Sequence, residues 1–329
     1  MAIDLLGIQP HKVSRDLSGY IIFVYGKAKT GKTTFATQRS DTLLLAFEQG
    51  YNALPGVYAF NVNTWGEMRQ VYRELKKPEV KDRYKTIVID TVDLAADACQ
   101  KYICNQLGIE NMGDGGWGTN SWSKYKKEFE EVFRGLTMMG YAVIFISHEK
   151  EGSYKDKSGK EHTFIRPSTQ SSALAIIENM ADVYGYAHTE LNSMNESQVF
   201  LTVRASGSDD IACGCRFKYI EPTIPFTYDA LEKAVRDAID KEAQMTNGCF
   251  LTEERQAPVE AVTYDFDALM AEFQELVGAL MNKDSAKYAP LVTKVIDKYL
   301  GKGKKVVDAT RDQAELIYLI VTEIKEDIV

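Results

Sequence analysis

A glycine-rich stretch near the N-terminus has the residue types and spacing that bind a triphosphate. Gly26, Gly31, Lys32 and Thr33 follow the pattern G-x-x-x-x-G-K-[ST]. The glycines let the backbone curl so that consecutive N–H groups face phosphate oxygens, the lysine supplies a positive charge, and the threonine hydroxyl suits Mg²⁺. We therefore expect ATP and Mg²⁺ to bind the loop formed by Gly26, Lys27, Ala28, Lys29, Thr30, Gly31, Lys32, Thr33 and Thr34.

Three further polar side chains stand directly after apolar runs, where a parallel sheet would bring them to one edge. Asp90 ends TIVID, Glu48 follows LLLAF, and His148 follows IFIS. With Thr33, the carboxylate of Asp90 is expected to hold the metal, and Glu48 is expected to orient and deprotonate the attacking water. His148 is expected to contact the γ-phosphate and report its loss. The alternative for each is a structural role, because acids at strand ends and single histidines are common.

The elements around these residues alternate between strands and helices. Runs of β-branched and aromatic residues separated by helical patterns predict βαβ units, hence an α/β fold with a mostly parallel sheet. The last two runs are joined by a turn-like segment and predict an edge β-hairpin. The expected strands cover residues 20–25, 42–47, 57–61, 86–90, 141–147, 182–189 and 198–204, and the expected helices cover 64–77, 91–106 and 120–139.

The last part of the chain has a different character. Residues 1–241 are expected to form the core, 242–264 a linker, and 265–329 a small all-helical domain, because the linker shows no sustained periodicity. Within that domain, Thr310 and Gln313 have the spacing of a capping box. The lysines of GKGKK in this domain fit either a solvated turn or a contact with DNA or protein. Its expected helices cover residues 266–282, 285–300 and 310–326.

Composition limits the kinds of partner. The 329 residues carry a net charge of −8, so contact with nucleic acid requires a local patch or a surface shared between subunits. Five cysteines without framework spacing indicate reduced thiols and a cytoplasmic setting, and no apolar run is long enough to cross a membrane. Cys213 and Cys215 have no second pair or nearby histidine to complete a metal site.

Two long polar segments are candidates for contact with nucleic acid. Residues 107–122 are glycine-rich and contain Trp117 and Trp122, whose rings can stack on unpaired bases. Residues 149–170 interleave basic residues with Tyr154 and Phe164, although four acids nearly cancel the positive charge. The alternative is that both are ordinary surface loops with their aromatic rings packed on the core.

The order of these parts resembles the RecA-like recombination ATPases, and most closely those that phages encode for single-strand annealing. The resemblance covers about residues 18–240. It implies that residues 26–34 are the Walker A loop, Asp90 the Walker B acid and Glu48 the general base, while His148 takes a position where relatives often have glutamine. It also implies that the two long segments bind DNA. Arg204 and Arg216 would reach a neighbouring subunit's γ-phosphate.

These features favour a DNA-stimulated ATPase that acts on single-stranded DNA in phage recombination or replication, in the host cytoplasm. ATP would lie between subunits of a homo-oligomeric ring or filament, and the helical domain would contact a single-strand binding or replication protein. The alternative is a nucleotide-switched adaptor, such as a helicase loader or packaging accessory. A GTPase is disfavoured because no N-K-x-D pattern follows a core strand. A small-molecule kinase fits the long polar segments poorly.

Overall fold

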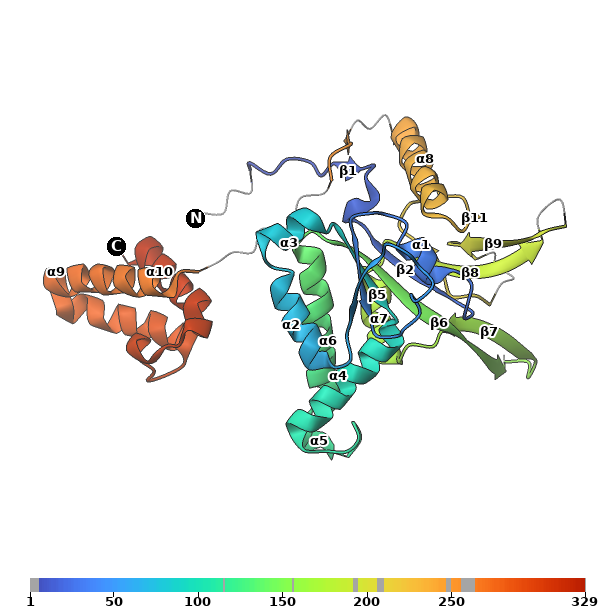
Figure 1. Cartoon of the computed structure of the whole chain (residues 1–329). Coiled ribbons are helices and arrows are strands. Elements are labelled where there is room, and N and C mark those ends of the chain that lie inside the picture. The colour runs from blue at the N-terminus through green and yellow to red at the C-terminus, as the bar shows by residue number, and fades with distance from the viewer. Residues whose placement is uncertain are drawn as a thin grey trace. The chain divides into compact units, whose positions relative to one another are not determined.

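The computed structural model divides the chain into two compact units, Met1–Glu260 and Ala261–Val329. Each unit has its own apolar core and is described by itself (Figure 1). The residues that the structure describes are 6–114, 116–155, 157–191, 195–205, 210–246, 250–255 and 264–328.

The first unit is built on a large sheet whose strands follow the order β11-β9-β8-β2-β6-β5-β3-β4. The run from β8 to β4 is parallel throughout, as expected, and the β8–β9 hairpin extends it with antiparallel pairing. The strands are β1 (Val13–Ser14), β2 (Ile21–Gly26), β3 (Thr42–Ala46), β4 (Tyr58–Asn61), β5 (Thr86–Asp90), β6 (Ala142–Lys155), β7 (Glu161–Pro167), β8 (Val183–Leu191), β9 (Ser197–Thr202), β10 (Gly214–Cys215), β11 (Thr223–Pro225) and β12 (Leu251–Thr252).

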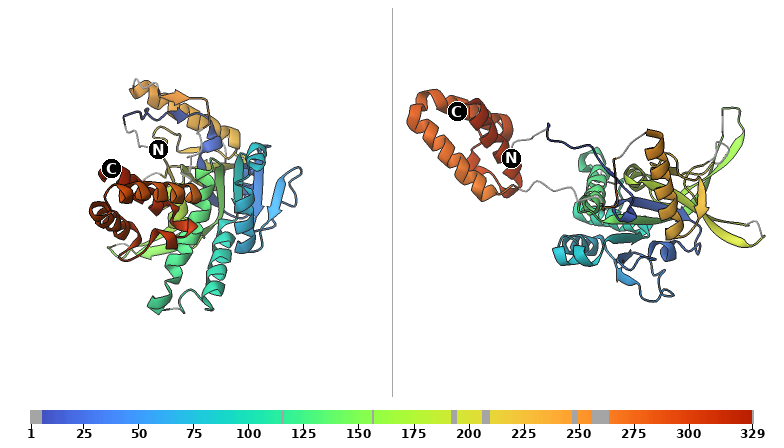
Figure 2. Two further views of the ribbon diagram at one scale, coloured as in Figure 1. Left: turned by 90° about the vertical axis from the view of Figure 1, so that its left-hand side faces the viewer. Right: turned by 90° about the horizontal axis from the view of Figure 1, so that it is seen from above.

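Helices cover both faces of this sheet, which is why its central strands are apolar at nearly every position. One face packs against α2, α4, α6 and α7, and the other against α1 and α8 (Figures 1 and 2). Alternate residues of one strand therefore enter different cores; Phe23 belongs to the first and Val24 to the second. The helices of this unit are α1 (Lys32–Ala36), α2 (Trp65–Glu74), α3 (Pro78–Arg83), α4 (Val92–Leu107), α5 (Gly116–Thr119), α6 (Ser121–Met138), α7 (Ser171–Met180) and α8 (Tyr228–Thr246).

The expectation of a long loop at residues 149–170 was wrong. β6 continues beyond the sheet to Lys155 and pairs with β7 in a seven-residue antiparallel ladder, from Glu149 opposite Pro167 to Lys155 opposite Glu161. Residues 168–170 lead into α7, whose N-cap is Gln170. The strands of this hairpin are polar and largely exposed, so they lack the apolar alternation that marks a half-buried strand.

The expected linker at 242–264 also differs from the structure. α8 runs on to Thr246, and β12 pairs in parallel with β1, far away in the sequence. Arg255 then donates to the backbone oxygens of Ser18, at 2.9 Å, and Lys85, at 3.1 Å. The first unit thus extends well beyond residue 241, while residues 247–249 and 256–263 lie outside the described part of the chain.

The second unit is helical, as expected. Non-helical backbone angles at Asp284 divide α9 (Phe266–Leu300) where the sequence predicted a break between two helices. The predicted capping box is confirmed at Thr310 and Gln313, one short 3₁₀ turn before α10 (Ala314–Asp327). Ile317, Ile320 and Ile324 of α10 are fully buried in the core that the two parts of α9 share.

Candidate nucleotide-binding site

The glycine-rich loop joins the central strand β2 to α1. Gly26 ends β2 beside β8, and a Cβ there would lie 2.2 Å from the carbonyl oxygen of Ala187. Gly31, the residue before α1, has a φ of +83°, which favours glycine although the surrounding space is open. The two glycines of the motif are therefore required for different reasons, the first for strand packing and the second for the turn into the helix.

The side chain of Lys32 is hydrogen-bonded to the backbone of this same loop. Its side chain is 6% exposed, and Nζ donates to the carbonyl oxygens of Gly26 at 2.9 Å and Lys27 at 2.6 Å. Burial lowers the pKa of Lys32, against the opposing influence of Asp90 and neighbouring acids. An ammonium group held by two carbonyls can exchange these weak partners for phosphate oxygens, so it suits anion binding.

Thr33 and Asp90 form a hydrogen-bonded pair beneath the loop. Thr33 Oγ1 donates to Asp90 Oδ2 at 2.7 Å, and Asp90 is 4% exposed. Burial raises the pKa of Asp90, while the bond from Thr33 lowers it. A hydroxyl that donates to a buried carboxylate keeps its oxygen lone pairs available, and hard oxygen donors are what Mg²⁺ prefers. The donor set fits the expected metal.

Glu48 and His148 face each other across the same cavity. The carbonyl oxygen of Asp90 accepts bonds from the N–H groups of Phe47 and Glu48, which fixes Glu48 at the end of β3. Its Oε2 lies 3.2 Å from Nε2 of His148, and both side chains are partly exposed. The cavity measures about 460 Å³ and is lined by Ala28, Lys29, Gly31, Lys32, Thr33, Thr34, Glu48, Gly50, Ala53, Leu54, Asp90 and His148.

Two acids beside this cavity were missed from the sequence. Asp93 accepts hydrogen bonds from the hydroxyls of Ser147, Ser168 and Thr169, so it ties both ends of the β6–β7 hairpin to α4. Its spacing of three residues from Asp90 was a signal for a second acid at the same edge of the sheet.

Glu149 is the second missed acid. It lies on the hairpin directly after His148, its side chain is 9% exposed, and it accepts a bond from the Tyr186 hydroxyl at 2.9 Å. One of its oxygens lies 3.9 Å from Nζ of Lys27 in the loop. The residue after a strand-end histidine carries no distinctive signal in one sequence, so its approach to the loop needed the structure.

Comparisons with known proteins agree with this geometry. Residues 18–210, more than half of the chain, match the family model described as an AAA domain. The chain belongs to the AAA domain family. It is also 31% identical over 332 residues to the "SPbeta prophage-derived uncharacterized protein YorG" of Bacillus subtilis (strain 168), with 99% of each chain covered. The similarity to that relative therefore includes the helical C-terminal unit as well as the AAA domain.

Arg204 does not project from the AAA domain as a neighbour-reaching cation would. Its Nη2 donates to the carbonyl oxygens of Phe217 at 2.8 Å and Cys215 at 3.3 Å in the same chain. It follows β9, which runs antiparallel to β8, so it lies toward the edge of the sheet opposite the phosphate-binding loop. In this structure Arg204 fastens the segment after β10.

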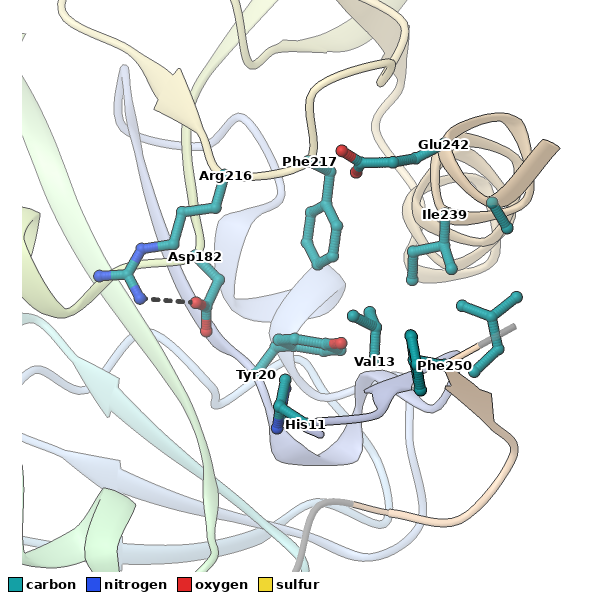
Figure 3. Close-up of a pocket in the computed structure, with 11 residues that line it drawn as sticks. His11, Val13, Tyr20, Asp182, Arg216, Phe217, Ile239, Glu242 and Phe250 are labelled. Atoms are coloured by element: carbon teal, nitrogen blue, oxygen red, sulfur yellow. Dashed lines mark hydrogen bonds and ion pairs between the residues drawn. The ribbon is translucent and has the colours of Figure 1, made fainter. Parts of the chain in front are cut away.

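Arg216, which lies beyond the segment matched by the AAA model, is also remote from the loop. It is paired with Asp182 at 3.1 Å, and Asp182 accepts a bond from the N–H of Ile21 at the start of β2. Figure 3 shows this pair at one side of a second cavity, with Ile239 and Phe250 at the opposite side and Tyr20 and Phe217 between them. That cavity, of about 550 Å³, lies at the sheet edge away from the nucleotide site.

The structure describes the side chains of only some of the aromatic residues that were expected to contact nucleic acid. Trp122 lies in the first turn of α6, with its ring centre 6.0 Å from that of Tyr125, and is 41% exposed. The side chains of Trp117 and Tyr154 are outside the part of the chain that the structure describes. Within the described part of the AAA domain protein, no three His, Cys, Asp or Glu side chains gather into a metal cluster. None of its described helices is long and apolar enough to cross a bilayer.

Proposed function

We propose that this AAA domain protein binds and hydrolyses ATP with Mg²⁺, and that it acts on single-stranded DNA in phage recombination or replication. One observation carries the first part: the loop lysine, the Thr33–Asp90 pair and Glu48 face a single cavity at the ends of three parallel strands. This arrangement suits the positioning and charge neutralisation that phosphoryl transfer requires.

Each side chain has a role that follows from its contacts. Lys32 releases the loop carbonyls and holds the β- and γ-phosphates, while Thr33 and Asp90 hold Mg²⁺, which neutralises charge on the phosphates when bound. Glu48 accepts a proton from the attacking water, and His148 orients the Glu48 carboxylate. Because the His148 imidazole is within reach of Glu48 and lines the cavity, it can exchange this partner for the γ-phosphate.

The β6–β7 hairpin supports the proposed action on DNA. It continues the strand that carries His148, so a shift of His148 at the γ-phosphate would act on the base of the hairpin through one continuous strand. The hairpin also carries Arg166, whose guanidinium lies 4.9 Å from the ring centre of Phe164. The prophage origin in the name of the Bacillus relative supports a phage setting. We further propose that ATP lies between subunits of a homo-oligomeric ring or filament, although Arg204 and Arg216 are held within their own chain.

A second function is favoured by the separate helical unit. In this alternative the protein is a nucleotide-switched adaptor, a helicase loader or packaging accessory, and residues 261–329 dock a replication or single-strand binding protein. The observation behind it is that this unit has its own core and is shared with the Bacillus relative.

One experiment separates the two functions. ATP turnover is measured with and without single-stranded DNA over a salt series, with Lys32→Ala as the inactive control and Lys126→Ala, an exposed lysine of α6, as the matched neutral control. Stimulation that fades as salt rises supports the first function, because phosphate contacts are salt-sensitive. Turnover that ignores DNA supports the adaptor. Turnover that survives Lys32→Ala would overturn both.

A further inference from the structure

A local concentration of positive charge in the first unit lies away from the nucleotide site. Residues 69–85, from α2 through α3, contain seven basic and three acidic residues, a net charge of +4 in a chain of −8. The β6–β7 segment, residues 149–170, has five basic and four acidic residues, a net charge of +1. Figure 1 shows α2 and α3 on the side of the core opposite this hairpin, and the view from above agrees (Figure 2).

Three exposed basic residues of this segment, Arg73, Lys76 and Arg83, form no ion pair with a carboxylate among the described residues. Lys76 Nζ lies 4.6 Å from the centre of the Tyr72 ring instead. The remaining basic residues of the segment are less available: Arg69 pairs with acids of α6, Lys77 pairs with Glu74, Lys85 pairs with Asp82, and Lys81 is half-buried.

Aromatic rings stand beside these cations on the outer strand of the sheet. Tyr58 and Phe60 of β4 are 46% and 47% exposed, and β4 lies at the end of the sheet order. The Arg83 guanidinium lies 4.7 Å from the Tyr58 ring centre and 5.4 Å from that of Tyr84. A cation against a ring holds the ring in place and supplies charge next to it, as in proteins that stack unpaired bases.

Two hollows connect the cations to the rings. One, of about 540 Å³, contains Arg73 and Lys76. The other, of about 270 Å³, is mostly apolar and contains Phe60 with Leu75 and Val80, although Glu67 and Glu74 also line it. Gln70 of α2 lines both hollows, so they lie on either side of one helix. Charged and apolar recesses side by side suit a ligand with both phosphates and exposed bases.

We propose that Tyr58, Phe60, Arg73, Lys76 and Arg83 form an outer basic surface that binds single-stranded DNA. The cations contact backbone phosphates, and the two rings of β4 stack on unpaired bases, which duplex DNA keeps paired within its stack. The proposal takes the kind of strand from the proposed function, but the surface is separate from the ATP site. An acidic protein has no bases to stack on Tyr58 and Phe60, so the exposed rings favour a polynucleotide.

The test measures binding of a fluorescent oligo-deoxythymidine to the full chain by anisotropy, without nucleotide, over a salt series. Arg73→Glu with Lys76→Glu should lower affinity roughly tenfold or more and reduce the salt slope by about 1.4, the value for two lost single-strand phosphate contacts. The matched control reverses the charge of Lys124 and Lys127, two exposed lysines of α6, and should change affinity little.

A second variant tests the two aromatic rings of β4. Tyr58→Ala with Phe60→Ala should lower affinity roughly 5- to 150-fold for each stacked base that is lost, with the salt slope unchanged. If this pair fails to fold, photocrosslinking of iodo-deoxyuridine to the wild-type protein tests the same contact, and adducts at Tyr58 or Phe60 support it. Adducts confined to other segments would overturn it.

Other binding results would also count against the proposed DNA-binding surface. Equal affinity for duplex DNA, or tighter binding of oligouridine than of oligo-deoxythymidine, would overturn the proposal as stated. The proposal would also be overturned if these variants changed the oligomeric mass but left DNA binding intact. The same holds if the surface captured an acidic protein while its variants left DNA binding intact. Lys32→Ala should bind DNA like the wild type in this assay, so failure of the ATPase proposal and failure of this surface are read separately.

Discussion

Gly26→Ala is expected to damage the sheet before it damages the phosphate contacts. The new methyl carbon would lie 2.2 Å from the carbonyl oxygen of Ala187, whereas real Cβ atoms essentially never approach within 3.0 Å. β2 and β8 must therefore separate by about 0.8 Å where they are hydrogen-bonded neighbours. Overpacking of this kind costs about 1–3 kcal/mol.

That cost can be measured as a melting temperature. In a unit of this size each kcal/mol lowers the Tm by about 2–4 °C, so Gly26→Ala should melt roughly 2–12 °C below the wild type. Hydrogen exchange should also accelerate in β8. Affinity for a fluorescent ATP analogue should fall, because the loop begins at the displaced residue.

Two other glycines provide the controls. Gly31→Ala meets no atom within 4 Å but must hold a φ of +83°, which costs about 1–2 kcal/mol without disturbing β8. Gly159→Ala has a φ of +84° in the β6–β7 turn and should show the same backbone cost with unchanged ATP affinity. If Gly26→Ala had the wild-type Tm, ATP affinity and β8 exchange rates, the packing explanation would be refuted.

Further expected outcomes concern a proposed metal ligand, an arginine at the end of β9, a core residue and an acid beside the loop. Asp90→Asn should abolish ATP turnover yet raise the metal-free Tm at neutral pH. Burial raises the pKa of Asp90, so the wild-type protein loses stability as the pH rises from 3.8 through that raised pKa. The difference in Tm between the variant and the wild type should therefore disappear as the pH falls toward 3.8. Arg204→Ala should lower unfolding free energy by about 1–3 kcal/mol, through its lost bonds to two carbonyls, and leave ATP affinity unchanged, as denaturant titration and analogue binding can check. Trp65→Ala should cost about 3–5 kcal/mol because its ring is fully buried, and a smaller loss by denaturant titration would contradict that packing. Glu149→Gln should tighten ATP binding by roughly 2- to 5-fold, since it removes a carboxylate 3.9 Å from Lys27, and equal affinities by calorimetry would exclude this influence.

The parallel core could be read from the sequence because its physical signature is local. A strand buried on both faces must be apolar at nearly every position, so TIVID at 86–90 coincides with β5 residue for residue. The polar residue that ends such a strand is then delivered to a known edge. This explains why Asp90, Glu48 and His148 were correctly expected around one loop.

The failures have equally specific causes. The β6–β7 hairpin is polar on its exposed faces, so residues 149–170 lacked the alternation that reveals a strand. β1 and β12 are each two residues long, which is too short to show a periodicity. They also pair although they lie near opposite ends of the first unit's sequence. Arg204 is different, because the sequence already predicted the hairpin that precedes it. β9 ends with Thr202 level with Tyr25, beside the start of the loop, but because β9 runs antiparallel to β8 the chain after it leads away from the loop, so the direction of Arg204 followed from an expectation already made.

The charges around the loop explain why one set of residues can serve both an empty and a loaded site. Lys32 lies near four carboxylates, those of Asp90, Glu149, Glu48 and Asp93 (the last held by the hydroxyls of Ser147, Ser168 and Thr169), and each raises the pKa of the lysine against the larger lowering by burial. Its ammonium is nevertheless hydrogen-bonded to backbone carbonyls, and the carboxylates are held elsewhere, by Thr33, by His148 and by Tyr186. Each acid therefore already has a partner that fixes its orientation before any phosphate arrives. An anion entering this cavity would meet excess negative charge unless a divalent cation came with it, which makes the Thr33–Asp90 pair as important for admitting the nucleotide as for its chemistry.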